Sequence, residues 1–268
     1  MPLLLVPRIT GRSGRILPIL LACSLAGCRS GPARFEDAST WQRVSGDLLQ
    51  APARIGSDFG KVFGDLENRE FLGTAGVLTY GLELVLDGGS FDQRFRNNDV
   101  LGGTVSDSLD LAGRGSVLFG TSLAWMLYGS ARDDRATYEA GKSMLRSLTV
   151  AGLTSTLLKV AIPDDRPDGN PYSFPSGHAT ESMAFAATIG GTYGHRAAAP
   201  LYLLSLGVGI QRMDDAKHDL GDVLFGWALG YVVGRTLAEG RSPSVFGAKV
   251  GLFLAPEFGG VGVGLTWR

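Results

Sequence analysis

The feature that most constrains this chain is a series of six apolar segments, separated by charged, glycine-rich or proline-containing breaks. None shows the strict alternation of a half-buried strand, so they predict an all-α fold, a helical bundle of about six core helices. Most fall short of the ~20 consecutive apolar residues that a membrane span needs. We favour a water-soluble bundle, and a compact membrane bundle with polar residues facing a cavity is the alternative. The six segments are Phe71–Leu86, Ser116–Tyr128, Ser143–Ile162, Ala179–Tyr193, Ala198–Ile210 and Asp222–Ala238.

The composition is that of a folded domain. Of the 268 residues, 44% are hydrophobic and the formal net charge is -1, which excludes wholesale disorder. The chain has 25 Lys and Arg residues and 26 Asp and Glu residues, so it lacks the basic excess of a nucleic-acid binder. We therefore expect no nucleic-acid partner. The 39 glycines are about twice the usual ~7% share and favour closely approaching helices or irregular turns.

The N-terminus has the pattern of a secretion signal. The first 35 residues contain no Asp or Glu, and a basic region precedes a short apolar stretch at Ile16–Gly27. The stretch leads into Leu25-Ala26-Gly27-Cys28, which resembles a bacterial lipobox. The resemblance implies a signal peptide at residues 1–27 and a lipidated Cys28. It also implies a periplasm-facing envelope lipoprotein, with the outer membrane as the expected location. A plain secretory signal and an uncleaved membrane anchor are the alternatives.

The remaining chain divides into three parts. Residues 28–70 predict a tether followed by one or two amphipathic helices, at Trp41–Gln50 and Ile55–Glu67. Residues 71–240 hold the six apolar segments. Residues 246–268 change to a period of two around a Pro-Glu-Phe-Gly-Gly connection, which predicts a short β-hairpin.

Three cations occur in or beside the breaks between the later segments. Lys159, Arg166 and Arg212 supply what an oxyanion with a charge near two requires, because Arg offers a bidentate fork and Lys a point charge. Pro163 ends the preceding helix, so we expect Lys159 in its last turn and Arg166 on the loop beyond.

The string Ser176-Gly177-His178 predicts an anion site at a helix N-terminus. Ser176 suits the N-cap of a helix that begins at Gly177, whose first N–H groups would then point at the anion. Gly177 has no side chain to block a close approach, and His178 lies at the same helix end.

His218 and Asp222 are spaced i, i+4, so on a helix their side chains share a face and touch. A carboxylate bonded to one ring nitrogen fixes the tautomer and leaves the other nitrogen as a nucleophile or a base. The third histidine of the chain, His195, follows an apparent helix end and is interpreted as a loop or capping residue.

The order and spacing of these clusters resemble the type 2 phosphatidic acid phosphatase superfamily, which also holds bacterial acid phosphatases and vanadium haloperoxidases. The motifs are Lys-x6-Arg-Pro, Pro-Ser-Gly-His and Arg-x5-His-x3-Asp, and they span residues 159–222. The third motif usually opens with Ser-Arg, whereas this chain has Gln211-Arg212. Because Gln also donates a hydrogen bond, we expect tuning of the site rather than its loss.

The resemblance implies a helical fold, no cofactor, no catalytic metal and a phosphohistidine intermediate. His218 would attack the phosphorus and Asp222 would orient its ring. His178 would protonate the leaving oxygen and then activate water. The phosphoryl oxygens would be held by Lys159, Arg166, Arg212, Ser176 and the N–H of Gly177.

The expected substrate is a phosphorylated small molecule or a lipid phosphate, and the sequence predicts no oligomeric state. One alternative is a vanadate-dependent haloperoxidase, although such enzymes are usually longer than this chain. Another is a catalytically inactive structural envelope lipoprotein, which Gln211 and the predicted hairpin favour. The nearby acidic residues are interpreted as a solvated helix end (Asp107 and Asp110) and as charge balance for the arginines (Asp164-Asp165 and Asp214-Asp215).

Overall fold

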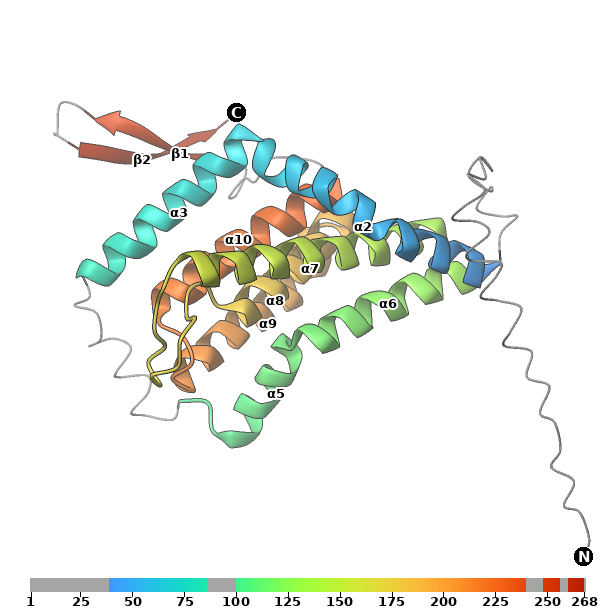
Figure 1. The fold of residues 1–268 in the computed structure, drawn as a ribbon, viewed down its shortest axis with the longest axis horizontal. Helices are drawn as coiled ribbons and strands as arrows, with labels where there is room; N and C mark the ends of the chain where they lie inside the picture. Colours follow the sequence, from blue (N-terminus) through green and yellow to red (C-terminus); the bar gives the residue numbers. More distant parts are fainter. Residues whose placement is uncertain (1–38, 86–99, 240–247, 256–259, 268) are drawn as a thin grey trace, which may run out of the picture. The chain divides into compact units, whose positions relative to one another are not determined.

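The computed structural model describes residues 39–85, 100–239, 248–255 and 260–267. The predicted signal peptide, Cys28 and the first part of the predicted tether lie outside the described residues. The described chain is predominantly helical, which confirms the predicted fold class (Figure 1). Its helices are α2 (Thr40–Gly64), α3 (Leu66–Val85), α5 (Gly103–Gly113), α6 (Gly115–Ala131), α7 (Arg135–Ala161), α8 (Gly177–Tyr193), α9 (His195–Asp214) and α10 (Leu220–Glu239).

The helix α2 covers most of the stretch in which the sequence predicts one or two amphipathic helices. It begins with a capping box between Ser39 and Gln42 and continues through Pro52. A proline removes one N–H donor from a helix, but Val44 before it and Val62 after it are both buried. Packing on both sides of the proline therefore keeps α2 continuous.

The helices α8 and α10 pack along each other at the centre of the bundle. A Cβ at Gly230 of α10 would overlap the main-chain oxygen of Thr180, and one at Gly234 would overlap that of Ala184. These positions require glycine because the two backbones approach so closely. Part of the glycine excess therefore serves close helix contacts, as the composition predicts.

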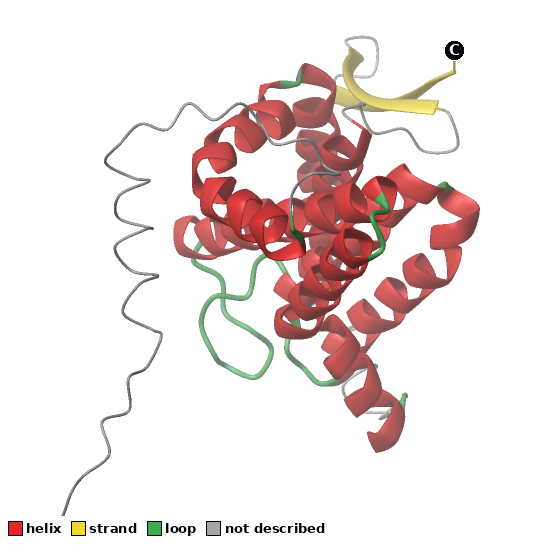
Figure 2. Ribbon diagram, turned by 90° about the vertical axis from the view of Figure 1, so that its right-hand side faces the viewer, coloured by secondary structure: helices red, strands yellow, loops and turns green. Residues whose placement is uncertain are grey.

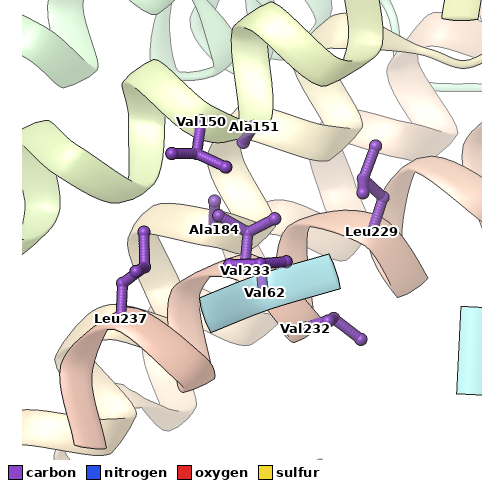
Figure 3. Close-up of a cluster of buried hydrophobic side chains, with 8 residues drawn as sticks. All are labelled: Val62, Val150, Ala151, Ala184, Leu229, Val232, Val233 and Leu237. Atoms are coloured by element: carbon purple, nitrogen blue, oxygen red, sulfur yellow. The ribbon is translucent and has the colours of Figure 1, made fainter. Parts of the chain in front are cut away.

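A large hydrophobic cluster joins α2, α7, α8 and α10 (Figure 3). Between α2 and α7, the buried Asp58 forms an ion pair with the partly buried Arg146, whose Nε donates to Asp58 Oδ2 at 2.8 Å. The cluster consists of Val62, Val150, Ala151, Ala184, Leu229, Val232, Val233 and Leu237.

Besides the short connections between helices, a long loop and a pair of strands lie outside the helices of the described chain. Residues 162–176 form a loop between α7 and α8, drawn green in Figure 2. The strands β1 (Ala248–Ala255) and β2 (Gly260–Trp267) pair antiparallel, from Ala248 opposite Trp267 to Ala255 opposite Gly260. This pairing agrees with the predicted hairpin. Among the described helices, none is both long enough and apolar enough to cross a membrane.

Candidate active site

The predicted site residues come together from four parts of the chain. These are the last turn of α7, the loop 162–176 with the start of α8, the end of α9, and the turn that leads into α10. The contacts described below connect these parts into one cluster.

His218 and Asp222 form the pair that the sequence predicts, but not on one helix. His218 lies in the turn before α10, and Asp222 lies in its first turn. His218 Nδ1 is 3.0 Å from Asp222 Oδ2, and both residues are buried. The hydroxyl of Ser173, a residue that the sequence analysis missed, donates to the same Oδ2. The carboxylate oxygen places the ring proton on Nδ1, which leaves the lone pair of Nε2 available for chemistry.

Lys159 and Arg166 lie where the sequence predicts, in the last turn of α7 and on the following loop. The ammonium of Lys159 donates to the main-chain oxygens of Tyr172 at 2.9 Å and Ser173 at 2.6 Å, which fixes the loop to the helix. Burial lowers the pKa of Lys159 to about 8, although the Asp222 carboxylate opposes this shift.

Ser176 occupies the N-cap position of α8, but its hydroxyl makes no capping hydrogen bond, contrary to prediction. Instead its backbone N–H donates to the main-chain oxygen of Asp222 at 3.0 Å, which joins the starts of α8 and α10. Its buried Oγ, and the buried Nε atoms of Arg166 and Arg212, have no hydrogen-bond partner among the described residues. Buried polar atoms normally have partners, and all three of these groups can donate to an oxyanion.

Asp110 of α5 connects the two remaining predicted residues. Its Oδ1 accepts a hydrogen bond from Arg212 Nη1 at 2.7 Å and lies 3.5 Å from His178 Nε2, while Oδ2 binds Arg114. Its interpretation as part of a solvated helix end is therefore wrong. Burial opposes ionisation of Asp110, but the hydrogen bond from Arg114 and the charge of Arg212 lower its pKa.

Both site histidines favour the neutral form. Burial, together with the charge of Arg212, lowers the pKa of His178 to about 4 despite the nearby Asp110 carboxylate. Burial also lowers the pKa of His218, and Asp222 acts in the opposite direction. A neutral His218 keeps the Nε2 lone pair that a nucleophile needs.

The residues flanking Arg212 have structural contacts. Gln211 is buried, and its Nε2 donates to Ser106 Oγ at 3.1 Å and to Asp215 Oδ2 at 2.6 Å. Asp214 accepts two backbone N–H groups from the chain preceding α5. Burial lowers the pKa of Arg212, and the charge of Asp215 opposes this shift, which agrees with the charge-balance interpretation. Asp214, by contrast, pairs with no arginine among the described residues. His195 is the first residue of α9, and its Nδ1 is 3.2 Å from the hydroxyl of Tyr202.

Comparison with known proteins identifies the family of the region that contains this cluster. A family model of the PAP2 superfamily matches residues 140–242, which include every predicted site residue from Lys159 to Asp222 but not Asp110. The fold is similar to the crystal structure of a transmembrane PAP2-type phosphatidylglycerolphosphate phosphatase from Bacillus subtilis. That similarity has a TM-score of 0.50 and 22% sequence identity, and it covers 62% of this chain and 92% of that chain. No curated protein matches this sequence.

Proposed function

Residues 140–242 are a PAP2 superfamily domain, and from that premise we propose that this protein is a metal-independent phosphatase acting on phosphate monoesters or lipid phosphates. The proposal rests on one observation. A buried imidazole held by a carboxylate shares a cluster with a second histidine and with buried donors that have no hydrogen-bond partner in the described part of the chain. Such an arrangement suits attack on phosphorus, where catalysis is largely positioning and charge stabilisation.

The proposed reaction has two steps. His218 Nε2 attacks the phosphorus, and the bond from phosphorus to the leaving oxygen breaks while His178 gives that oxygen a proton. Water then attacks the phosphohistidine, His178 takes a proton from it, and the N–P bond breaks to release inorganic phosphate. Asp222 stabilises the positive charge on the His218 ring.

In this proposal, the three cations and the donors at the start of α8 hold the phosphoryl oxygens. Lys159, Arg166 and Arg212 neutralise the developing charge, and Ser176 and the N–H of Gly177 donate at the helix end. A phosphate anion in the site would also raise the low pKa of His178, because it offsets the arginine charge that disfavours the protonated ring. Substrate binding thereby prepares the general acid.

We further propose that the protein acts outside the cytoplasm as an envelope lipoprotein. The lipobox-like string that ends at Cys28 and the short apolar stretch before it support this location. Acyl chains on Cys28 would hold the enzyme at a membrane surface, where lipid phosphates are concentrated. Lipid phosphates are therefore favoured over small soluble esters as substrates.

The test uses the full-length protein purified from membranes in detergent. p-Nitrophenyl phosphate and a panel of lipid phosphates are assayed without added metal and with EDTA, and turnover is expected. His218→Ala and His178→Ala should each reduce kcat/KM by at least about 1,000-fold. The matched control His195→Ala, outside the cluster, should retain activity.

Absence of turnover with every ester, combined with absence of vanadate binding, would contradict the proposal. Vanadate-dependent oxidation of halide by peroxide, without phosphatase activity, would indicate a haloperoxidase instead.

A further inference from the structure

A separate pocket of about 420 Å³ lies between α3, the end of α7, the loop 162–176 and α10. None of the residues assigned to the phosphatase reaction lines it. Figure 1 shows α3 and α10, which pack against each other. The described wall consists of Gly76, Thr79, Tyr80, Glu83, Leu158, Ile162, Pro163, Asp164, Phe174 and Phe225.

Aromatic rings from three different elements contribute to the wall. Tyr80 comes from α3, Phe174 from the loop and Phe225 from α10. The rings of Phe174 and Phe225 pack with their centroids 4.8 Å apart and their planes tilted by 40°. Aromatic rings attract cations that lie over their faces within about 6 Å, and they accept alkyl groups equally well.

The charged groups in the described wall are both carboxyls, Glu83 and Asp164, and no Lys, Arg or His accompanies them. Glu83 lies against Gly221 in the first turn of α10, where a Cβ would overlap its carboxylate. Asp164 forms no ion pair with any described residue. Burial, with the nearby Asp222 carboxylate, raises the pKa of Asp164, so a cation beside it would relieve an unfavourable negative charge.

The neighbouring lysine fills this role only in part, because its charge lowers the pKa of Asp164 without forming an ion pair with it. Lys159 lies on α7 between the two wall residues Leu158 and Ile162, yet its ammonium donates to main-chain oxygens of the loop. The pocket therefore combines aromatic walls with the Asp164 carboxyl, whereas the phosphate site is lined by cations.

We propose that this pocket binds an organic ammonium ion, with Asp164 as its counter-ion and the rings of Tyr80, Phe174 and Phe225 as its apolar wall. Charge complementarity selects this occupant, because the Asp164 carboxyl repels a phosphate and gives no advantage to an uncharged alkyl chain. The inference is independent of the proposed phosphatase activity.

The pocket and the phosphate site share one loop. The backbone N–H of Ser173 donates to the main-chain oxygen of Asp164 at 2.9 Å, and the Ser173 hydroxyl contacts Asp222. Phe174 is the next residue along the chain. An ammonium ion in the pocket thus contacts the segment that supports the proposed nucleophile.

The test compares choline with 3,3-dimethylbutan-1-ol, its uncharged isostere, by calorimetry and ligand-observed NMR on the full-length protein. Choline should bind at least about tenfold more tightly, since ion pairing and cation–π attraction are absent from the alcohol. Equal affinities, or no binding of choline, would overturn the proposal.

Matched variants locate the binding. Asp164→Asn should weaken choline binding about tenfold and leave the alcohol unaffected, whereas Asp165→Asn, next to the wall but outside it, should change neither. His218→Ala should retain choline affinity, so failure of the phosphatase proposal remains distinguishable from failure of this one. Equal loss of choline affinity in both aspartate variants would contradict the assigned counter-ion.

Discussion

The helices α8 and α10 contribute to two regions that are built differently. Along their bodies, small residues such as Gly230 let the backbones meet. At their first turns, by contrast, Ser176 keeps a buried hydroxyl without a partner among the described residues. The middle parts of α8 and α10 thus pack closely against each other, whereas their first turns retain hydrogen-bond donors for a ligand. Stability and chemistry therefore depend on different residues and can be tested separately.

Two arginines test this separation, because we expect one to affect mainly stability and the other mainly catalysis. Arg146 pairs with buried Asp58 between α2 and α7. We predict that Arg146→Ala lowers the free energy of unfolding by about 3 kcal/mol, because the buried Asp58 carboxylate then keeps only the exposed Lys61 ammonium, 3.9 Å away, as its ion-pair partner. Denaturant unfolding measures this effect. At temperatures where the variant stays folded, kcat should change less than about threefold. A large loss of kcat in the folded variant would show that the two regions are coupled.

Arg166 provides the converse case. It lies on the loop 162–176, and its buried Nε has no partner among the described residues. We predict that Arg166→Ala lowers kcat/KM by about 100- to 1,000-fold, the usual effect of removing a donor that stabilises transition-state charge. Its unfolding free energy should stay within about 1 kcal/mol of the wild-type value. A kcat/KM equal to that of the wild type would show that Arg166 is not one of the residues that hold the phosphoryl oxygens.

The smallest predicted effect concerns Asp110. Its carboxylate raises the pKa of His178, against burial and Arg212, so Asp110→Asn should lower that pKa further. Activity requires protonated His178 and falls as pH rises through its pKa. The alkaline limb of the kcat/KM profile should therefore move to lower pH, with about tenfold less activity at pH 7. An unchanged limb, or one moved to higher pH, would show that Asp110 does not support the acid.

The sequence predicts those parts of the fold and site that depend on local signals. Helix ends and breaks place Lys159 and Arg166 correctly, because proline and charge mark the end of α7. Contact between His218 and Asp222 is also predicted, although a turn rather than one helix brings them together. Around Pro52 the local signal leaves one helix or two open, and packing on both sides of the proline decides for the single helix α2.

Asp110 shows why other contacts of the site could not be predicted from the sequence. It lies 102 residues before Arg212, in α5, whose sequence GTVSDSLDLAG mixes polar and apolar residues without a strong helical stripe. No local pattern distinguishes this aspartate from a solvated one. Its contacts with Arg212 and His178 depend on how α5 packs against α8 and α9.

Chemical trapping of the intermediate tests the central claim most directly. The enzyme is mixed with a ³²P-labelled phosphate ester, quenched in alkali within milliseconds and analysed by peptide mass spectrometry. We predict a phosphoryl group on the peptide that carries His218, at up to one per chain, and no label in His218→Ala. Inorganic phosphate released in a single turnover without any labelled His218, or with the label on another residue, would contradict the account.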